Sequence, residues 1–291
     1  SQQSEKIRRK HMSQEQSESM PQWHSPEVAQ HWQQEAEQRQ QNMEEATRHM
    51  LLSAQLKPGD RVLDIAAGTG DQSILAARMV GPTGLVLATD ISAEMLHVAA
   101  SLAQQEELTN ISTQVMDAGQ LDLDDETFDA AICRNGLMLV PRLEVALSEI
   151  HRVLKPGSTL AALVWSAPER NPLHALPLAL IAKYTGAVSA CSNSANAPGP
   201  FSLADKRRFE QALADAGFRD VVIQAIPLQL HFASAKAFMG SRMKLVASTI
   251  ERLSQQDQQR LAEEVRQVLS QFEGPQGLVT SGETLLGVGT R

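Results

Sequence analysis

Several patterns that define common classes of protein are missing from this chain. It has only two cysteines, Cys133 and Cys191, which are too few for a disulfide framework or a cysteine-based metal site. It has no apolar run of about 18 residues or more, so we expect no membrane-spanning helix, and no segment resembles a signal peptide. We therefore expect a protein of the reducing cytoplasm.

Positive charge is scarce as well. The chain has 26 Lys and Arg against 34 Asp and Glu, a formal net charge of −8. Residues 1–11 resemble an expression remnant because of the His11-Met12 junction, and they carry four basic and one acidic side chain. Without them the net charge falls to −11. So acidic a chain, with no basic patch, is not expected to bind nucleic acid.

Two apolar segments, each followed by an acidic residue, flank a glycine-rich turn. The first contains Asp64 and leads into Gly68-Thr69-Gly70-Asp71, and the second, residues 85–89, ends at Asp90. This layout is typical of a strand–loop–helix–strand unit that holds a nucleoside. The glycines let the backbone approach the ligand, and the acid after the second strand can accept both ribose hydroxyls.

Two nucleoside cofactors compete for such a unit. A nicotinamide dinucleotide needs a pyrophosphate seat with a third small residue, but Ser73 stands there, and Asp64 and Asp71 place negative charge near the loop. Carboxylates repel phosphate and attract cations. S-adenosylmethionine has no phosphate and carries ammonium and sulfonium charges, so the pattern favours it; a nicotinamide oxidoreductase is the alternative.

Polar residues also end two later apolar segments. Residues 110–116 predict a strand that ends at Asp117-Ala118, and residues 127–133 predict one that ends at Arg134-Asn135. Parallel sheets bind ligands at the carboxyl ends of their strands. Asp117 could accept from an adenine amino group beside the Ala118 N–H, and Arg134 could hold the cofactor carboxylate or an acidic substrate. A turn residue and a surface ion pair are the structural alternatives.

The span from Asp60 to Trp165 resembles the core of a class I S-adenosylmethionine-dependent methyltransferase, in particular the group that includes the ubiquinone and menaquinone C-methyltransferases and the type 11 small-molecule enzymes. The segments that carry the resemblance are residues 64–71, 89–96 and 149–157. Quinone methyltransferases have a further signature after the fifth strand, where this chain reads Val164-Trp165-Ser166-Ala167-Pro168-Glu169-Arg170-Asn171-Pro172 instead.

The resemblance implies an α/β fold: a doubly wound, mostly parallel seven-stranded sheet with an antiparallel last strand and a helical cap. The candidate cofactor-binding residues are Asp64, Ala66, Gly68, Thr69, Gly70, Asp90, Ile91, Met95, Asp117, Ala118, Arg134 and Asn135. In resembling enzymes an N-terminal helix covers cofactor and acceptor, which makes Trp32 a candidate acceptor contact.

Five regions follow from this reading. They are an expression remnant (1–11), a tail with cap helices (12–56), the S-adenosylmethionine-binding core (57–166), a lid insertion (167–200) and the C-terminal part of the sheet with a helical insertion (201–291). Periodicity predicts helices over about 26–40, 43–55, 203–216 and 234–272, a strand over 219–230, and a closing hairpin at 278–280 before a last strand at 285–290.

Methyl transfer is an in-line displacement in which the protein supplies alignment and excludes water, so neither a nucleophile nor a metal is required. His174 in the lid is the candidate general base. Asn171 and Tyr184, in the same segment, are candidate contacts of a small-molecule acceptor. A protein that binds S-adenosylmethionine for a non-methylating reaction or as a scaffold is the alternative function. The acceptor, the methylated atom and the oligomeric state stay open.

Overall fold

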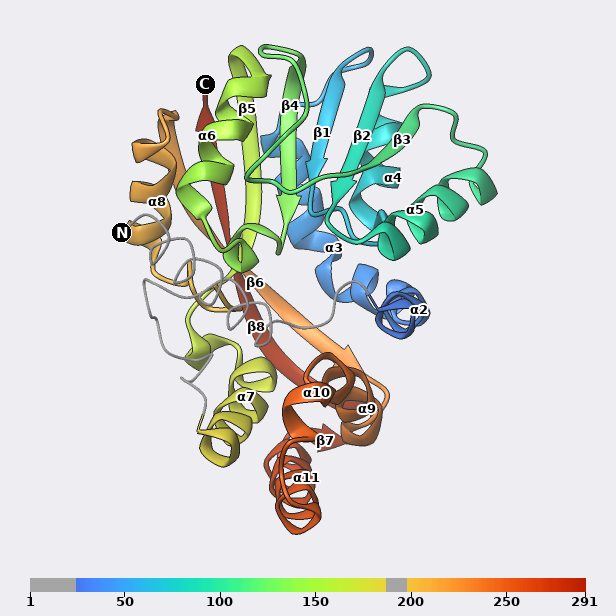
Figure 1. Ribbon diagram of the computed structural model, residues 1–291, viewed down its shortest axis with the longest axis vertical. Helices are drawn as coiled ribbons and strands as arrows, with labels where there is room; N and C mark the ends of the chain where they lie inside the picture. Colours follow the sequence, from blue (N-terminus) through green and yellow to red (C-terminus); the bar gives the residue numbers. More distant parts are fainter. Residues whose placement is uncertain (1–24, 187–197) are drawn as a thin grey trace, which may run out of the picture.

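The computed structural model describes residues 25–186 and 198–291; the predicted expression remnant and Cys191 lie outside them. A twisted sheet forms the centre, with the strand order β3-β2-β1-β4-β5-β8-β6 (Figure 1). The strands are β1 (Arg61–Ile65), β2 (Leu85–Asp90), β3 (Ile111–Val115), β4 (Phe128–Arg134), β5 (Leu154–Trp165), β6 (Arg219–Phe232), the short β7 (Glu273–Gly274) and β8 (Gly277–Thr290). The pairs within β1–β5 are parallel, whereas β8 is antiparallel to β5 and β6. The predicted mostly parallel sheet with an antiparallel last strand is confirmed.

Helices cover both faces of the sheet. They are α2 (Pro26–Gln34), α3 (Ala36–Ser53), α4 (Asp71–Val80), α5 (Ala93–Gln105), α6 (Leu143–Val153), α7 (Pro172–Thr185), α8 (Lys206–Asp215), α9 (Ala235–Leu245), α10 (Ala247–Ile250) and α11 (Gln255–Ser270). Alternate strand residues enter two separate cores: Val62 packs with α3 and α4, and Leu63 with α6 and α8. This alternation is what a strand buried on both faces requires.

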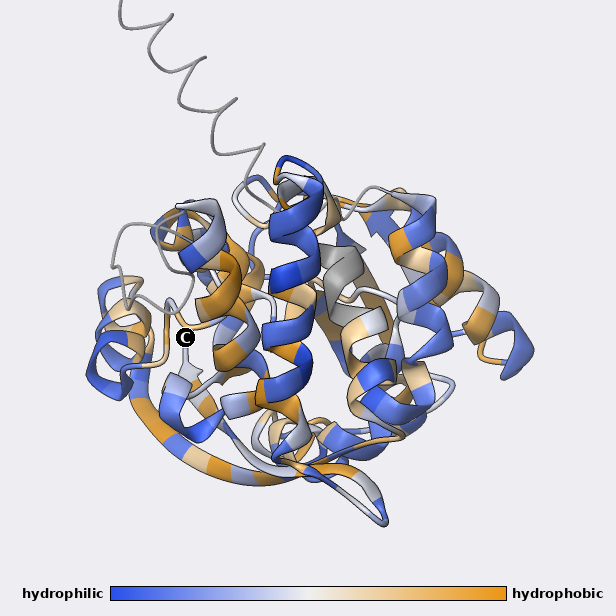
Figure 2. Ribbon diagram, turned by 90° about the horizontal axis from the view of Figure 1, so that it is seen from below, coloured by the Kyte–Doolittle hydropathy of each residue, from blue (hydrophilic) through white to orange (hydrophobic). Residues whose placement is uncertain are grey.

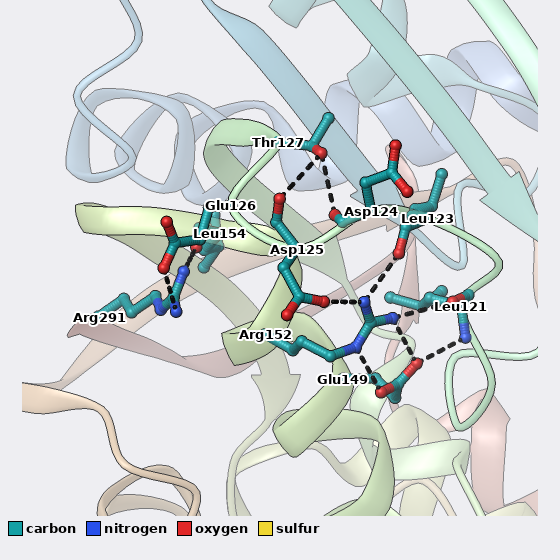
Figure 3. A network of polar contacts seen from close by, with 10 residues as sticks. All are labelled: Leu121, Leu123, Asp124, Asp125, Glu126, Thr127, Glu149, Arg152, Leu154 and Arg291. Atoms are coloured by element: carbon teal, nitrogen blue, oxygen red, sulfur yellow. Dashed lines mark hydrogen bonds and ion pairs between the residues drawn. The ribbon is translucent and has the colours of Figure 1, made fainter.

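The link between β3 and β4 has no helix, and one arginine organises it (Figure 3). The Arg152 guanidinium, from α6, donates to the carbonyl oxygens of Leu121 and Leu123 and pairs with Glu149 and Asp125. Carbonyls that a helix would have satisfied internally are thus satisfied by a side chain. The link therefore lies fixed across this face of the sheet.

The sheet continues into a long two-stranded ribbon. Strands β6 and β8 have 14 residues each, and they carry α9, α10 and α11, with α7 packed on α11 (Figure 1). Seen from below, the helices show both hydrophilic and hydrophobic residues along their length (Figure 2). The predicted hairpin at 278–280 and last strand at 285–290 form one continuous strand, β8, and the tight hairpin lies just before it, between β7 and β8. Gly282 is not a turn residue: a Cβ there would lie 3.0 Å from Leu230 Cδ1, so glycine permits close packing on β6.

Two other predicted boundaries differ. The first two helices meet at Glu35 rather than near residue 41. At this break the Arg39 guanidinium donates to the Trp32 carbonyl oxygen. The predicted helix over 234–272 is three helices, and Ser254 starts the last one by accepting the Asp257 N–H. In the described ranges, no helix is long and apolar enough to cross a membrane.

Strand β6 lies at the edge of the sheet, and two residues protect its outer side. The Asn42 side-chain amide, from α3, accepts the His231 N–H at 2.9 Å and donates to the His231 carbonyl at 3.1 Å. Pro227 lies four residues earlier on the same side of the strand and has no N–H to donate. Both features disfavour pairing with another strand, and the first also fixes α3 against the ribbon.

Candidate cofactor site

The carboxyl ends of β1, β2 and β4 lie side by side, above α2 and α3 in Figure 1. Strand β1 pairs with β2 on one side and β4 on the other, so the chain order reverses here. Ligands of open α/β sheets bind at such a switch point. The predicted residues at the ends of these strands are therefore brought together.

The glycine-rich turn has a backbone conformation that favours glycine. Gly68 and Gly70 have φ values of +56° and +81°, and Ala66 also has a positive φ of +53°. A Cβ on Gly70 would come within 2.8 Å of the Ala99 Cβ on α5. Gly70 therefore serves both the turn and the close packing of α5.

Asp90 joins the two halves of the nucleoside motif. One carboxylate oxygen accepts the Gly68 N–H at 2.9 Å and the other accepts the Ser92 N–H at 2.9 Å. Two bonds from backbone N–H groups hold the carboxylate in one orientation beside the turn. A carboxylate oxygen can accept more than one hydrogen bond, so this geometry is compatible with ribose hydroxyls.

Asp64 lies behind the turn rather than on its surface. It is fully buried, and its carboxylate accepts bonds from the Ser73 hydroxyl and the Gln72 amide. Burial raises its pKa to about 7, against the opposing effects of these two donors and of Arg134. Asp64 thus anchors the start of α4, and its charge reaches a ligand only through space.

Asp71 is bracketed by two arginines. Its Oδ2 lies 2.8 Å from the Arg39 guanidinium and 2.9 Å from that of Arg134, and its Oδ1 accepts the Thr69 hydroxyl. Burial alone would raise the pKa of Asp71, but the two guanidinium charges outweigh it and hold the pKa below its usual range. The repulsion of phosphate expected from Asp71 is therefore offset, and Arg134 is in a buried ion pair rather than a surface one.

Arg39 belongs to this site but was not among the residues predicted for it. It donates to Asp71, to the Thr69 hydroxyl at 2.9 Å and to the Trp32 carbonyl at 2.8 Å. A signal was present: Arg39 shares one helical stripe with the buried residues Met43, Ala46 and Met50. A basic residue on an apolar stripe needs a buried partner.

Trp32 lies against the turn. Its indole Nε1 is 3.7 Å from where a Cβ on Gly68 would stand, and the Arg39 guanidinium lies over the ring at 4.7 Å from its centroid. With Val28, it packs on the buried Met95 of α5. The predicted N-terminal cover is therefore next to the glycine turn.

The remaining predicted cofactor residues lie around the same strand ends. Ile91 is 41% exposed just after Asp90. Asp117 is exposed and accepts the Gly119 N–H in a turn, with Ala118 next to it. Asn135 has a φ of +59°, and its buried Oδ1 has no hydrogen-bond partner in the part of the chain that the structure describes. A strained residue with an unused buried acceptor is typical of a ligand site.

The three predicted residues of the lid differ in placement. Asn171 is fully buried, and its amide bonds the backbone of Glu283 in both directions, at 2.9 Å each. Its role is to join α7 to β8, and we withdraw it as an acceptor contact. The Tyr184 hydroxyl donates to Glu264 at 2.6 Å and so joins α7 to α11.

His174 lies in an aromatic cluster. Its ring centroid is 4.4 Å from that of Trp165 and 6.2 Å from that of Phe238, which is in turn 4.8 Å from Phe232. The cluster connects the end of β5 with α7, α9 and the end of β6. The general-base role of His174 stays a prediction.

Comparison with known proteins identifies similar sequences and folds. The family model described as a methyltransferase domain matches residues 56–217. The ubiquinone/menaquinone biosynthesis C-methyltransferase UbiE of Teredinibacter turnerae is 42% identical over 120 residues, 41% of this chain and 48% of that protein. A demethylmenaquinone methyltransferase of Staphylococcus epidermidis is 30% identical over 184 residues, 61% of this chain and 76% of that protein.

The fold has similar solved structures as well. The YcgJ protein of Bacillus subtilis superposes with a TM-score of 0.57 at 18% identity, over 85% of this chain and 98% of that chain. The chain spans about half the length of the UbiE relative, and the family model ends at residue 217, before β6.

Proposed function

Since the chain belongs to the methyltransferase-domain family, we propose that it transfers a methyl group from S-adenosylmethionine to a small organic molecule. The observation that carries this proposal is the bond between the Asp90 carboxylate and the Gly68 N–H. It joins a ribose-binding acid to a glycine turn at the switch point of the sheet. A nucleoside fits this arrangement.

The residues present fit the parts of this cofactor. The Asp90 carboxylate would accept the two ribose hydroxyls, and the adenine would lie on the exposed Ile91 beside Asp117 and Ala118. The glycine turn, with Gly68 and Gly70, would lie along the sulfonium end. Asn135 offers a buried oxygen at the end of β4, where the methyl group and the acceptor would meet.

The cofactor, when bound, supplies the electrophilic methyl group. The chain's own task is then to align the acceptor and to exclude water. Trp32 covers the turn from one side, and the cap of α7, α9, α10 and α11 lies below the strand ends (Figure 1). The acceptor would lie between these covers.

For the acceptor we infer a compound with a planar ring. The relatives act, by their names, in quinone biosynthesis or on demethylmenaquinone. In this chain, support comes from the partly exposed rings of Trp165, His174 and Phe232 at the cap side of the sheet, which pack around the buried Phe238. Aromatic side chains favour stacking with flat apolar ligands. The segment after β5 departs from the quinone signature, so a hydroquinone is one ring class to test among others.

The test is product analysis with a labelled cofactor. Purified protein is incubated with methyl-labelled S-adenosylmethionine and a panel of hydroquinones, phenols, aromatic amines and non-aromatic amines, and products are identified by mass spectrometry. We expect label in a ring compound. Transfer only to non-aromatic acceptors would contradict the ring assignment. Binding of the cofactor without transfer to any class would favour the scaffold alternative.

A further inference from the structure

The two edges of the sheet differ in how well they are protected against pairing with another strand. At the β6 edge, Asn42 and Pro227 disfavour such pairing. At the opposite edge, β3 contains no proline and no charged residue, since residues 111–115 are Ile-Ser-Thr-Gln-Val. Its β-branched residues also favour strand pairing. Strand β3 therefore lacks the residues with which proteins usually protect an edge.

The bonds between β3 and β2 fix which backbone groups of β3 point outward. The Val86 N–H of β2 donates to the Asn110 carbonyl, and the Met116 N–H donates to the Asp90 carbonyl. Successive residues of a strand direct their N–H and carbonyl groups to alternate sides, so the even-numbered residues of β3 pair with β2. The odd-numbered residues, at 111, 113 and 115, direct theirs away from the sheet. In residues 25–186 and 198–291, no other strand lies beside them.

One face of β3 is open as well. The link between β3 and β4 has no helix, and a groove lies between this link and the sheet. Ser112 and Gln114 are the residues of β3 that face the groove, and both are exposed. Residues 121–124 of the link form part of the lining, and Arg152 holds the link in place (Figure 3). A strand added beside β3 would extend alternate side chains over this groove.

The charges of the groove indicate what such a strand carries. The Arg152 guanidinium is already paired with one carboxylate of the link and one of α6, and Arg61 is on β1, which β2 separates from β3. Asp122 and Asp124, the groove acids, are exposed and have no ion pair in the part of the chain that the structure describes. Figure 3 shows the Asp124 carboxylate directed away from Arg152. The groove acids therefore leave negative charge beside the edge strand, which attracts a cation.

We propose that the β3 edge binds an extended segment of another protein that carries lysine or arginine, and that this segment joins the sheet as a further strand. Its backbone would pair with the outward groups of residues 111, 113 and 115, and its basic side chains would reach the groove acids. A second copy of this chain is a poorer occupant. Its own β3 would present only Ser112 and Gln114 to the groove, without a cation, and it has the same formal net charge of −8.

Two synthetic peptides of alternating threonine and valine test the proposal, one with a lysine at each end and one with a glutamate at each end. Fluorescence anisotropy would measure both against the wild type, Thr113→Pro and Thr113→Val. Proline removes the central outward N–H and no bond to β2, which an edge strand tolerates, whereas valine keeps that N–H and is the matched control. A second comparison sets the double change Asp122→Asn and Asp124→Asn against Asp215→Asn, a change of an exposed acid on α8.

We expect the wild type to bind the lysine peptide at least tenfold more tightly than the glutamate peptide. Thr113→Pro should weaken binding of the lysine peptide at least tenfold, and Thr113→Val less than threefold. The double change of the groove acids should weaken it at least threefold, and Asp215→Asn should leave it unchanged. No binding of the lysine peptide at about 1 mM, or equal binding by the wild type and Thr113→Pro, would overturn the proposal.

Hydrogen exchange of the wild type gives a readout that does not depend on the folding of a variant. The lysine peptide should slow the amides of residues 111, 113 and 115 and leave those of 112 and 114 unchanged, because the latter already bond β2. Slowing of neither set, or of both equally, would contradict strand addition. Ultracentrifugation should give the same mass for the wild type and Thr113→Pro; a dimer that Thr113→Pro abolishes would make a second copy the occupant and overturn the proposed partner.

Discussion

Polar side chains on the two sides of the sheet form hydrogen bonds over different distances in the sequence. Around β1 and β2, bonds such as Gly68 to Asp90 join residues 22 positions apart. Around β6 and β8, Asn42 reaches His231 across 189 positions and Asn171 reaches Glu283 across 112. The glycine turn and its acid thus belong to one strand–helix–strand unit, whereas these two bonds of the cap side join segments more than 100 positions apart.

The family model matches only part of the two sides of the sheet. The family model covers residues 56–217, which include the glycine turn, and it ends before β6. Changes on the cofactor side should therefore affect a common property, the binding of the cofactor. Changes on the cap side should affect stability or acceptor turnover and leave cofactor affinity intact.

The largest effect is expected at the glycine turn. In Gly70→Ala, the new Cβ combines a φ of +81° with a 2.8 Å approach to the Ala99 Cβ. Strain of about 1–2 kcal/mol and overpacking of about 1–3 kcal/mol should add, and cofactor affinity should fall more than tenfold because the turn must shift. Urea denaturation and calorimetry measure the two effects.

Gly81→Ala is the matched control for that change. Gly81 also has a positive φ, +67°, but nothing lies within 4 Å of its Cβ position. It should lose only the strain, about 1–3 kcal/mol, because its ψ of −177° lies in a region that essentially only glycine adopts, and its cofactor affinity should be unchanged. Similar losses of affinity in both variants would remove the special role of the turn.

A pH effect is expected from Asp64 on the cofactor side. Its pKa is raised by burial from an ordinary value of 3.8 to about 7, so the folded state holds a proton that the unfolded state releases. This contribution to the free energy of unfolding is complete below about pH 3.8 and is lost as the pH rises through 7. In Asp64→Asn, the decline in stability between pH 5 and 8 should be smaller than in the wild type, as followed by thermal unfolding of the ligand-free protein. A parallel decline in both proteins would contradict the raised pKa.

On the cap side, Asn42→Ala should loosen the bond between α3 and the ribbon. It leaves the His231 N–H and carbonyl without their side-chain partner, which costs about 1–3 kcal/mol. Cofactor affinity should change less than threefold. Gln41→Ala is the control, since the Gln41 side chain donates to Glu37 on the exposed side of α3. If Asn42→Ala instead lost cofactor affinity and kept its stability, the division between the two sides would be wrong.

The smallest effect is expected for Tyr184→Phe. It removes the hydroxyl bonded to Glu264 on an exposed contact between α7 and α11, where Lys183 also binds Glu264. A loss of less than about 1 kcal/mol is expected, with acceptor turnover unchanged. A large loss of turnover at full stability would instead support the predicted role of Tyr184 as an acceptor contact.

The cofactor side could be predicted because its information is local. The spacing from Gly68 to Asp90 lies within one strand–helix–strand unit, and parallel pairing brings the ends of β1 and β2 together once the strands are recognised. The polar residues at the end of β4 follow from the same geometry. The prediction of the fold class and of the cofactor therefore depended little on contacts between distant parts of the sequence.

The cap side and Arg39 could not be predicted in the same way. The position of α3 over the turn depends on its packing against the whole sheet. In the sequence, Arg39 is therefore visible only as a charged residue on an otherwise apolar stripe. The close approach of Gly282 to Leu230 becomes visible only when β6 and β8 are paired. Asn171 was predicted to contact the acceptor because its actual partner, Glu283, is 112 positions away in the sequence.

The central claim, a site for S-adenosylmethionine centred on Asp90, is tested most directly by calorimetric titration of S-adenosylhomocysteine and NAD into the wild type and Asp90→Ala. The account predicts that the wild type binds S-adenosylhomocysteine and not NAD. It predicts that Asp90→Ala remains folded and binds at least tenfold more weakly, because charge-assisted bonds of about 1.5–3 kcal/mol are lost. Binding of NAD by the wild type, or wild-type affinity in a folded Asp90→Ala variant, would contradict it.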